Sequence, residues 1–480
     1  MTTQTRCFAI VAIAAASTAA CAASGTGDDG SRFAGPADAG GQPVTDAPAD
    51  VALLDTSMSD VVTPPPDAPD EPDADFCTGS GPIVVVGDTV NQYSTCTGAI
   101  AAASFANALC TCHDAAFAGY LRTRGFDSGL NPQDGGTSAP TAAPVGINNR
   151  YLSGGFTDIA GAFAITGYDP TIFAGYLKTA DDLRTVSDLT FVGYSRIAGD
   201  GWLAGSMFSL GPVTFDGDLH HKSFAIATPL DVKGSNQQGL VTVAPPCDCD
   251  PAHLLDVGKL IDDAKQSNDN WAIGLDPAAF SNILGSVDAT LPCGRFFLDS
   301  INVPLGLLTL HVTGRVALFI DGDITTLGKL SVDLTPGAQI DIFVRGTLHL
   351  TGEAGFGDQA HPAATRIYVG GSQDITLVGY DHFVGNIYAP LAKLYMPGYI
   401  PLYGALFVKD YISGSYTDLN YDSAITRAGD DCPPPPHCTQ CTGCTGGQAC
   451  VGGACGTCTT NDECCGLMKC VAGTCQNVIH

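Results

Sequence analysis

The sequence predicts an all-β protein, namely a right-handed parallel β-helix (β-solenoid) with a short helical insertion and a disulfide-rich C-terminal tail. Three observations predict this fold class. An aromatic-centred triplet recurs between residues 318 and 408, the 480-residue chain holds 58 glycines, and eleven of its 20 cysteines lie from residue 432 onward. A repeat of about 20–25 residues with one strand cluster per unit is typical of solenoids, whose units bury their apolar faces only against each other.

The recurring triplet is the strongest sign of stacked strands. Its copies follow one another at spacings of 24, 25, 20 and 19 residues, and they are Leu318-Phe319-Ile320, Ile342-Phe343-Val344, Ile367-Tyr368-Val369, Ile387-Tyr388-Ala389 and Leu406-Phe407-Val408. Residues 347–351 alternate apolar and polar side chains, which is the period of a half-buried strand. The alternative, a β-sandwich, would show hairpin turns about every 8–12 residues. The longer period therefore favours the solenoid.

We expect the solenoid domain to span residues 77–431. Two earlier segments indicate an upstream start, because residues 215–219 (FDGDL) resemble residues 320–324 (IDGDI) and residues 83–88 have a similar composition. A helical insertion is expected at about residues 251–287, with Asp250 as N-cap and Pro251 in the first turn. Its apolar residues fall at helical spacing, at Leu254, Val257, Leu260, Ile261 and Ala264. A second short helix is expected over residues 277–284.

Residues 1–20 are expected to be a lipoprotein signal peptide. A single charge at Arg6 precedes an apolar stretch that is too short for a permanent membrane helix. Residues 18–21 (TAAC) resemble the lipobox of bacterial lipoproteins, although the first position carries Thr in place of Leu, Val or Ile. The resemblance implies that Cys21 is lipidated, and two or more acyl chains anchor a protein firmly. The alternative is cleavage by ordinary signal peptidase near Ala22 or Ala23, which would give a soluble secreted protein.

Residues 21–76 are expected to form a disordered acidic tether rich in Pro, Ala and Asp. Residues 25–75 hold eleven Asp, one Glu and one Arg, which accounts for −11 of the formal net charge of −28. Such a segment cannot bury enough apolar surface to offset the entropy of ordering it. Calcium binding is the alternative for these Asp residues, but they lack the regular ligand spacing of a calcium loop.

The charge also excludes nucleic acid as a partner. The chain has 21 basic against 49 acidic residues, whereas phosphate binding requires clustered Lys and Arg. The expected partners are the membrane, through the N-terminal lipid, and polysaccharides or surface proteins. No cofactor is expected, because the sequence contains no phosphate loop and no helix with paired zinc-binding histidines.

Disulfide bonds are expected at 18 cysteines, with the pairing unknown, and residues 432–480 are expected to be a cysteine-rich disulfide module. Seven of these cysteines lie in the body and eleven in the tail, so at least one bridge should join body and tail, with Cys432 as the candidate. Metal binding by Cys438, Cys441 and Cys444 beside His437 is the alternative, and we predict no metal site. The 18 residues are Cys77, Cys96, Cys110, Cys112, Cys247, Cys249, Cys293, Cys432, Cys438, Cys441, Cys444, Cys450, Cys455, Cys458, Cys464, Cys465, Cys470 and Cys475.

Three stretches carry a family resemblance. Residues 315–425, with the IDGDI segment and residues 385–390 (GNIYAP), resemble an uncharacterised β-solenoid domain of bacterial surface and pilus-associated proteins, and are similar to bactofilins in texture only. Residues 247–249 (CDC) and 268–276 resemble secreted proteins of myxobacteria, which suggests a myxobacterial-type surface lipoprotein. The tail from Cys455 to Cys475 resembles knottin-like or Dickkopf-like repeats, in which bridges replace a hydrophobic core. The resemblance implies an envelope location and no established activity.

Candidate acids and bases are present without a catalytic pattern. They are Asp321, Asp323, Glu353, Asp358, His361, Asp381 and His382. Asp321 and Asp323, like Asp216 and Asp218, flank turn glycines, where Asp commonly hydrogen-bonds its own backbone. We therefore predict no catalytic residue and no enzymatic activity. The alternative is a secreted polysaccharide-degrading β-helix enzyme, a lyase or a glycosidase, by analogy of fold alone.

The sequence thus predicts a non-enzymatic cell-surface lipoprotein with a structural, adhesive or ligand-binding role, located at the outer membrane or the cell surface. Five tyrosines of the last coils are candidates for stacking on sugar rings or on partner proteins. The alternative is that they are buried inside the coil or stack on the rings of neighbouring coils. They are Tyr395, Tyr399, Tyr403, Tyr411 and Tyr416.

Overall fold

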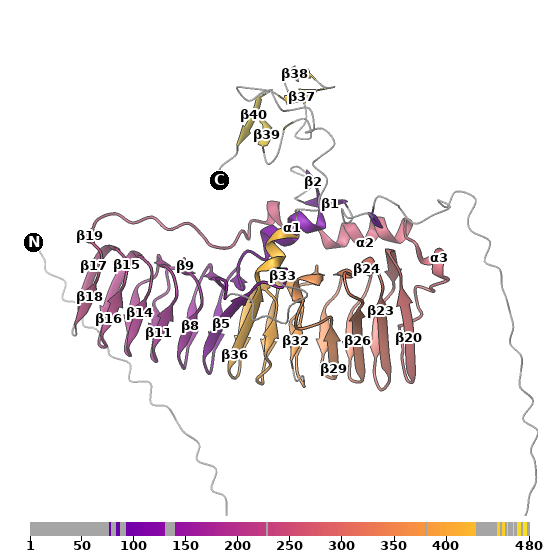
Figure 1. Ribbon diagram of the computed structural model, residues 1–480, viewed down its shortest axis with the longest axis horizontal. Helices are drawn as coiled ribbons and strands as arrows, with labels where there is room; N and C mark the ends of the chain where they lie inside the picture. The colour runs from indigo at the N-terminus through magenta and orange to yellow at the C-terminus, as the bar shows by residue number, and fades with distance from the viewer. Residues whose placement is uncertain are drawn as a thin grey trace, which may run out of the picture. The chain divides into compact units, whose positions relative to one another are not determined.

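The structure is a computed structural model, and it describes residues 76–77, 83–86, 93–129, 140–226, 229–379, 382–428, 449–451, 454–456, 458, 464, 468–471 and 474–477. The fold is a parallel β-solenoid, in which each strand of a coil pairs in parallel with the equivalent strand of the next coil (Figure 1). This confirms the predicted fold class.

The solenoid consists of two halves, which we call the N-half (residues 109–238) and the C-half (residues 286–422). Every coil has three faces, and β15 and β17 bend from the first face onto the second. The N-half places on its first face β3 (Leu109–Thr111), β6 (Val145–Ile147), β9 (Phe163–Ile165), β12 (Leu183–Thr185), β15 (Gly201–Ser209), β17 (Leu219–Ile226) and β19 (Asn236–Gln238). On its second face it places β4 (Ala115–Phe117), β7 (Tyr151–Ser153), β10 (Thr171–Phe173) and β13 (Leu189–Phe191). On its third face it places β5 (Leu121–Phe126), β8 (Thr157–Ile159), β11 (Leu177–Thr179), β14 (Ser195–Ile197), β16 (Val213–Phe215) and β18 (Leu230–Val232).

The C-half is built in the same way. Its first face contains β21 (Gly294–Leu298), β24 (Arg315–Ile320), β27 (Gln339–Val344), β30 (Thr365–Val369), β33 (Asn386–Met396) and β35 (Leu406–Ser413), of which β33 and β35 continue onto the second face. Its second face also contains β22 (Ile301–Val303), β25 (Ile324–Thr326), β28 (Leu348–Leu350) and β31 (Ile375–Leu377). Its third face contains β20 (Ser286–Leu291), β23 (Leu307–Val312), β26 (Lys329–Leu334), β29 (Glu353–Phe356), β32 (Phe383–Val384), β34 (Leu402–Tyr403) and β36 (Thr417–Asp422).

The two halves form one continuous solenoid, but not in chain order. The last coil of the C-half pairs with the first coil of the N-half, through Leu406 opposite Leu109 on β35 and β3 and through Thr417 opposite Leu121 on β36 and β5. The coils therefore run in space from residue 286 to 422 and then from 109 to 238. A crossover, residues 239–285, leads from the last coil of the N-half back to the first coil of the C-half (Figure 1). The predicted helical insertion belongs to this crossover.

The crossover contains one of the two predicted helices. A single 3₁₀ turn, η2 (Pro251–His253), is capped by the Asp250 carboxylate, which accepts a hydrogen bond from the Ala252 N–H. The helix α2 (Val257–Gln266) follows, and its buried face matches the predicted spacing. The second predicted helix, over residues 277–284, is wrong. These residues run beside β22 instead, because Phe280 and Ile283 are buried in the coil interior at this end of the C-half. A short helix, α3 (Asn270–Ile273), precedes them.

The aromatic triplets stack as predicted, and they form a second core outside the coil. Phe319, Phe343 and Tyr368 occupy equivalent positions on β24, β27 and β30, and consecutive ring centroids lie 4.9 Å apart. Tyr388 and Phe407 continue the row in register. All of these rings point out of the first face and are buried by α1 (Thr97–Ser104), α2 and η4 (Ser423–Arg427). Another 3₁₀ turn, η3 (Pro362–Ala364), precedes β30.

The solenoid starts upstream of the aromatic triplets, as expected, but of the two segments that indicated this, residues 215–219 lie in the solenoid and residues 83–86 do not. β1 (Ile83–Val86) pairs with β2 (Tyr93–Cys96) as an antiparallel hairpin, so residues 83–86 are not a coil strand. The FDGDL and IDGDI segments form turns at different corners. Phe215 ends a third-face strand, whereas Ile320 ends a first-face strand. The similarity is therefore one of turn chemistry, with an Asp-Gly-Asp sequence at a sharp corner, and not of position in the coil.

Disulfide bonds, expected from the cysteine count, are present. The body contains Cys77–Cys293, Cys110–Cys247 and Cys112–Cys249. Cys96 is also disulfide-bonded, and its partner is none of the other six body cysteines, since these pair among themselves. The disulfides indicate an exported protein, because a reducing cytosol keeps thiols free. Within the described residues, no helix has the length and apolar character needed to cross a membrane.

The described part of the tail consists of two short antiparallel hairpins. They are β37 (Ala449–Val451) with β38 (Ala454–Gly456) and β39 (Met468–Val471) with β40 (Thr474–Asn477). Cys458 and Cys470 form a disulfide. Several predictions lie outside the described residues, namely the signal peptide, Cys21, the tether up to residue 75, Asp381, and Cys432, Cys438, Cys441, Cys444 and Cys465.

Candidate binding surface

The predicted acids and bases are engaged with separate partners. Asp321 forms ion pairs with Lys265 and Arg345. Burial opposes ionisation of Asp321, but the hydrogen bonds from these two cations outweigh it and lower the pKa of Asp321 below its ordinary value. This residue is therefore a carboxylate at neutral pH and a poor proton donor.

The remaining described candidates lie at other places on the coil. Glu353 pairs with Lys329 on the third face. Asp358 and His361 lie within 3.4 Å of each other in one exposed loop, where the carboxylate also accepts a hydrogen bond from the Ala360 N–H. His382 lies edge-on to the ring of Tyr403, with centroids 6.2 Å apart. The structure thus brings together Asp358 and His361 in a loop exposed to solvent.

The turn aspartates act differently from the expectation. The Asp218 carboxylate accepts a hydrogen bond of 2.7 Å from the Ser235 N–H, and the Asp323 carboxylate accepts one of 2.8 Å from the Thr347 N–H. Each donor belongs to the next coil and not to the turn of the aspartate itself. These residues therefore connect neighbouring coils, because a corner leaves backbone N–H groups outside the strand ladders.

The five candidate tyrosines divide between the interior and the surface. Tyr411 is fully buried in the coil, and Tyr403 is half-buried. Tyr395 projects from the second face and is 39% exposed, whereas Tyr399 and Tyr416 are 46% and 51% exposed. These last three residues are therefore at the surface, but Tyr416 also stacks on Tyr120 of the next coil, as the alternative predicts.

An aromatic ladder follows the corner between the second and third faces. Tyr120 stacks on Tyr416 with ring centroids 4.6 Å apart and on Phe156 at 4.3 Å, and Phe156 stacks on Tyr176 at 4.8 Å. The ladder crosses the junction, because Tyr416 belongs to the C-half and Tyr120 to the N-half. Each member directly precedes a third-face strand, and the members are Tyr416, Tyr120, Phe156, Tyr176 and Tyr194.

Glycine makes this corner possible. Gly193, which precedes Tyr194, has so little room that a Cβ atom would lie 2.3 Å from the backbone oxygen of Gly175 in the neighbouring coil. The sequence carries the corresponding signal, since residues 117–120, 173–176 and 191–194 read FAGY, FAGY and FVGY. This repeat was not among the predicted ones, because its members are short and their spacings differ from those of the aromatic triplets in the C-half. In the N-half, Val145 pairs with Phe163 and Leu183 with Gly201, so the spacing between those coils is 18 residues.

A row of apolar side chains on the second face accompanies the ladder. Leu152, Ile172 and Phe208 point outward from β7, β10 and β15 and are 38%, 45% and 42% exposed. Thr190 occupies the position between Ile172 and Phe208. We call the aromatic ladder and this row together the apolar stripe. Contiguous exposed apolar surface on a soluble domain marks an interaction site.

Charged side chains border the stripe on the third face. Along successive strands the outward positions carry Asp418, Arg122, Asp158, Lys178 and Arg196. Arg122 pairs with Asp418, Lys178 lies 3.7 Å from Asp158, and Arg196 pairs with Asp216 at 2.9 Å. The border is therefore polar but nearly neutral.

Two tyrosines of this region share the Asp418 carboxylate. The hydroxyls of Tyr399 and Tyr120 donate to it at 2.7 and 3.1 Å. Burial and the hydrogen bond to Asp418 raise the pKa of Tyr399 to about 12. Burial opposes ionisation of Asp418, but hydrogen bonds from Arg122 and both hydroxyls lower the pKa of Asp418 below its ordinary value.

The ring geometry decides which ligand the stripe suits. Tyr120 and Phe156 each have a stacked neighbour on both ring faces, so they present their edges to solvent. A sugar ring stacks on an open aromatic face, whereas aromatic and aliphatic side chains bordered by paired charges are typical of protein interfaces. The stripe therefore suits a protein partner better than a polysaccharide.

Residues 247–428 match a family model described as a domain of unknown function (DUF7305). The matched range begins in the crossover at Cys247 and ends directly after η4, so it contains α2, α3 and the whole C-half. The N-half, which carries most of the apolar stripe, lies outside the match. No curated protein matches the chain, and no solved structure matches it.

Proposed function

We propose that this protein is a non-enzymatic binding protein of the bacterial cell surface. A lipid on Cys21 holds it to the membrane, the acidic segment extends it from the surface, and the solenoid binds a protein of the cell envelope through the apolar stripe. The observation that carries the proposal is this stripe. Tyr176, Tyr194, Leu152, Ile172 and Phe208 are exposed on neighbouring coils of the N-half, with Thr190 between Ile172 and Phe208, and such a cluster of exposed apolar side chains is best explained by binding.

The rigidity of the solenoid supports this function. The stripe side chains project from hydrogen-bonded parallel strands or from corners fixed by glycine, and the rings hold each other in place. The stripe side chains lose little conformational entropy when a partner binds, because tyrosine and phenylalanine have few rotatable bonds and these rings are already ordered. Preorganised aromatic residues are the usual anchors of protein interfaces.

Site-specific photocrosslinking in living cells tests the binding role. A photoreactive amino acid is placed at residue 176 or 208 of the full chain, and matched controls carry it at exposed Asp288 or Asp333 on the third face of the C-half. We expect one envelope protein to crosslink at residues 176 and 208 and not at the control positions. Equal crosslinking at all four positions would contradict the proposal.

A cleavage screen tests the alternative function. The purified full chain is incubated with a panel of acidic and neutral polysaccharides, and new reducing or unsaturated ends are measured. We expect no product. If product forms and is lost when His361 or Asp358 is substituted, the protein is a polysaccharide-degrading enzyme and the binding proposal is wrong.

The lipid is tested separately. Cys21→Ser should move the protein from the membrane fraction into the medium, because lipidation of this residue is the proposed anchor. Unchanged membrane fractionation would refute the anchor, whereas the binding role of the stripe would stand.

A further inference from the structure

A taut segment crosses the outside of the N-half. We call residues 239–246 the strap, because they lead from β19 back to the position beside β6. From β19 to β6 the first face has five strand spacings, which span about 24 Å. The eight Cα–Cα steps from Gln238 to Pro246 span at most about 26–29 Å. The strap must therefore be almost fully extended.

Both ends of the strap are fixed. At one end the Gly239 N–H donates to the His221 carbonyl at 3.0 Å. At the other end Pro246 lies directly over Gly146, where a Cβ atom would come within 2.7 Å of it. The next residue, Cys247, forms a disulfide with Cys110. A segment that is extended and held at both ends has little freedom to collapse onto the sheet below.

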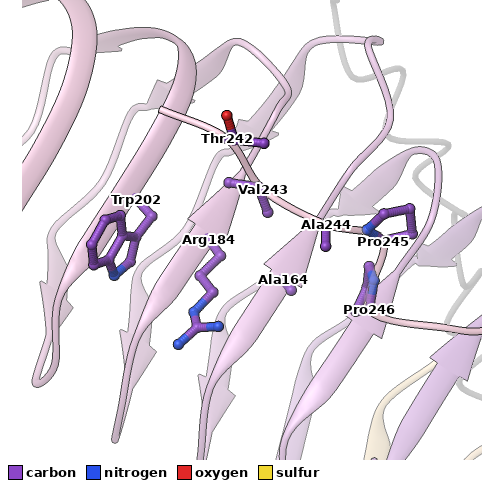
Figure 2. A pocket seen from close by; sticks show the side chains of 8 residues that line it. All are labelled: Ala164, Arg184, Trp202, Thr242, Val243, Ala244, Pro245 and Pro246. Carbon is purple, nitrogen blue, oxygen red and sulfur yellow. The ribbon is translucent and has the colours of Figure 1, made fainter. Parts of the chain in front are cut away.

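A groove separates the strap from the first face (Figure 2). It has a volume of about 490 Å³, within the range of about 300–1,000 Å³ typical of small-ligand sites. The sheet contributes three consecutive outward positions, Ala164, Arg184 and Trp202. The strap contributes the other wall, formed by Thr242, Val243, Ala244, Pro245 and Pro246.

Trp202 forms one end of this groove. His220 stacks on one side of the indole, with centroids 3.9 Å apart and planes 14° apart, and it belongs to the coil on the side away from Arg184. The other side of the indole is turned toward the coil of Arg184, which lines the groove together with Trp202. Unlike Tyr120 and Phe156, which have a stacked ring on both sides, Trp202 stacks on a ring on one side and lines the groove on the other.

The polar groups of the groove carry almost no net charge. Arg184 is paired with Asp182 at 2.9 Å. In the part of the chain that the structure describes, the backbone of residues 242–244 forms no hydrogen bond, so its N–H and C=O groups are available to a ligand. Asp200 and Asp218 occupy the same corner as Asp182 in the next two coils. The Asp200 N–H donates to the Asp182 carboxylate, and the Asp218 N–H donates to the Asp200 carboxylate. This row of carboxylates disfavours an anionic ligand.

We propose that the groove binds a neutral oligosaccharide that lies along the solenoid axis between the strap and the first face. A sugar unit has an apolar C–H face, which stacks on the indole of Trp202, and a rim of hydroxyls, which bonds to Arg184 and to the free backbone groups of the strap. The alanine at position 164 and the aliphatic strap side chains leave room for the next unit. This site is separate from the apolar stripe, which lies on the second face and the following corner.

Tryptophan fluorescence tests this site directly, because the sequence has two tryptophans. In a Trp271→Phe variant, Trp202 is the sole reporter. Cellohexaose, chitohexaose and maltohexaose serve as neutral probes, and hexagalacturonate as the anionic probe. We expect a saturable change of emission with at least one neutral probe. Hexagalacturonate should bind at least about tenfold more weakly than that probe. Calorimetry on the unmodified chain should return the same affinity.

Two matched arginines provide the control. Arg184 and Arg196 are each 54% exposed and each paired with an aspartate at 2.9 Å, but Arg196 lies on the third face. We expect Arg184→Ala and Trp202→Ala to weaken binding about tenfold or more by calorimetry, and Arg196→Ala to leave it unchanged. Lack of saturable binding of every neutral probe, equal affinity for hexagalacturonate, or unchanged affinity in Trp202→Ala would overturn the proposal. A Tyr176→Ala, Tyr194→Ala variant, which changes the apolar stripe, should bind the sugar as tightly as the unmodified chain. The two sites are therefore tested independently, and absence of sugar binding in the groove would leave the stripe proposal intact.

Discussion

At the scale of single residues, a buried ion pair holds α1 and η3 against the first face. Arg366 and Asp341 are 1% and 0% exposed, and the guanidinium donates to both carboxylate oxygens, at 2.6 and 3.1 Å. The Thr97 hydroxyl donates to Asp341, and the Ala363 carbonyl accepts from Arg366. Sequence alone shows two isolated charges in apolar strands. Their pairing depends on the register of β27 and β30, which a single-residue slip would change.

Removing one partner of this pair should be costly. We expect Arg366→Met to destabilise the fold by about 3–5 kcal/mol, because it leaves a buried carboxylate without a counter-charge. The double variant Arg366→Met, Asp341→Leu should recover much of this loss. Urea denaturation of the oxidised protein measures both, and equal stability of the single and double variants would contradict the explanation.

The corner glycines are a second residue-scale feature. Gly193→Ala should destabilise the protein by about 1–3 kcal/mol, because its Cβ meets the rigid backbone of the preceding coil at Gly175. Gly355→Ala is the matched control, since a Cβ there has no atom within 4 Å. It should be neutral or slightly stabilising. The comparison of the two thermal midpoints checks this, and equal losses in both variants would rule out the steric account.

At the scale of elements, sequence periodicity predicts the strands that recur in every coil, but it does not predict segments that occur once. The aromatic triplets predicted the stacking of β24, β27, β30, β33 and β35, because each coil must bury the same side chain at the same position. The helix α2 was predicted from its apolar spacing. Residues 277–284 have a helix-like pattern as well, but the open end of the coil offers them a larger apolar surface to bury. Tertiary burial overrides local pattern there.

The junction between β36 and β5 should make stability sensitive to acid. The pKa of Asp418 is lower in the folded protein than the ordinary value of about 3.9, so its ionised form stabilises the fold above about pH 4. That contribution is lost as the pH falls through the folded pKa. Asp418→Asn should cost about 1.5–3 kcal/mol at pH 7 and should flatten the decline of stability below pH 4.

Denaturation midpoints between pH 2.5 and 7 measure this effect. Asp288→Asn provides the control, because this carboxylate is 68% exposed on the third face of the C-half. We expect the control to follow the unmodified protein at every pH. A parallel decline in Asp418→Asn and the unmodified protein would show that another group causes the acid sensitivity.

At the scale of the whole molecule, the order of the coils could not be predicted from the sequence. The halves meet through Leu109 and Leu406, nearly 300 residues apart in the chain, and no local signal specifies such a contact. The disulfides Cys110–Cys247 and Cys112–Cys249 fasten the crossover beside this junction. Cysteine spacing predicted bonds but left their pairing open. The candidate site depended on the same non-local arrangement, since the ladder and the groove each join residues from several coils.

The two free ends of the solenoid explain why it should not grow into filaments. Phe280 and Ile283 cover the interior at the C-half end. At the N-half end, β19 places Asn236 and Gln238 at the inward positions, opposite Leu219 and His221 of β17. Asn236 is bonded to His221 at 2.9 Å. Polar residues at inward positions of an edge strand prevent another chain from continuing the sheet.

Replacing these two residues should therefore create an end-to-end contact. We expect Asn236→Leu, Gln238→Val to form elongating assemblies, which sedimentation velocity and electron microscopy detect as fibres whose length rises with protein concentration. Gln237→Leu is the control, because this neighbouring side chain points outward, and it should sediment like the unmodified chain. Fibres formed by the unmodified protein would show that polar inward residues do not block the edge. Association through the apolar stripe would instead give side-by-side particles of limited size, equal in all three proteins.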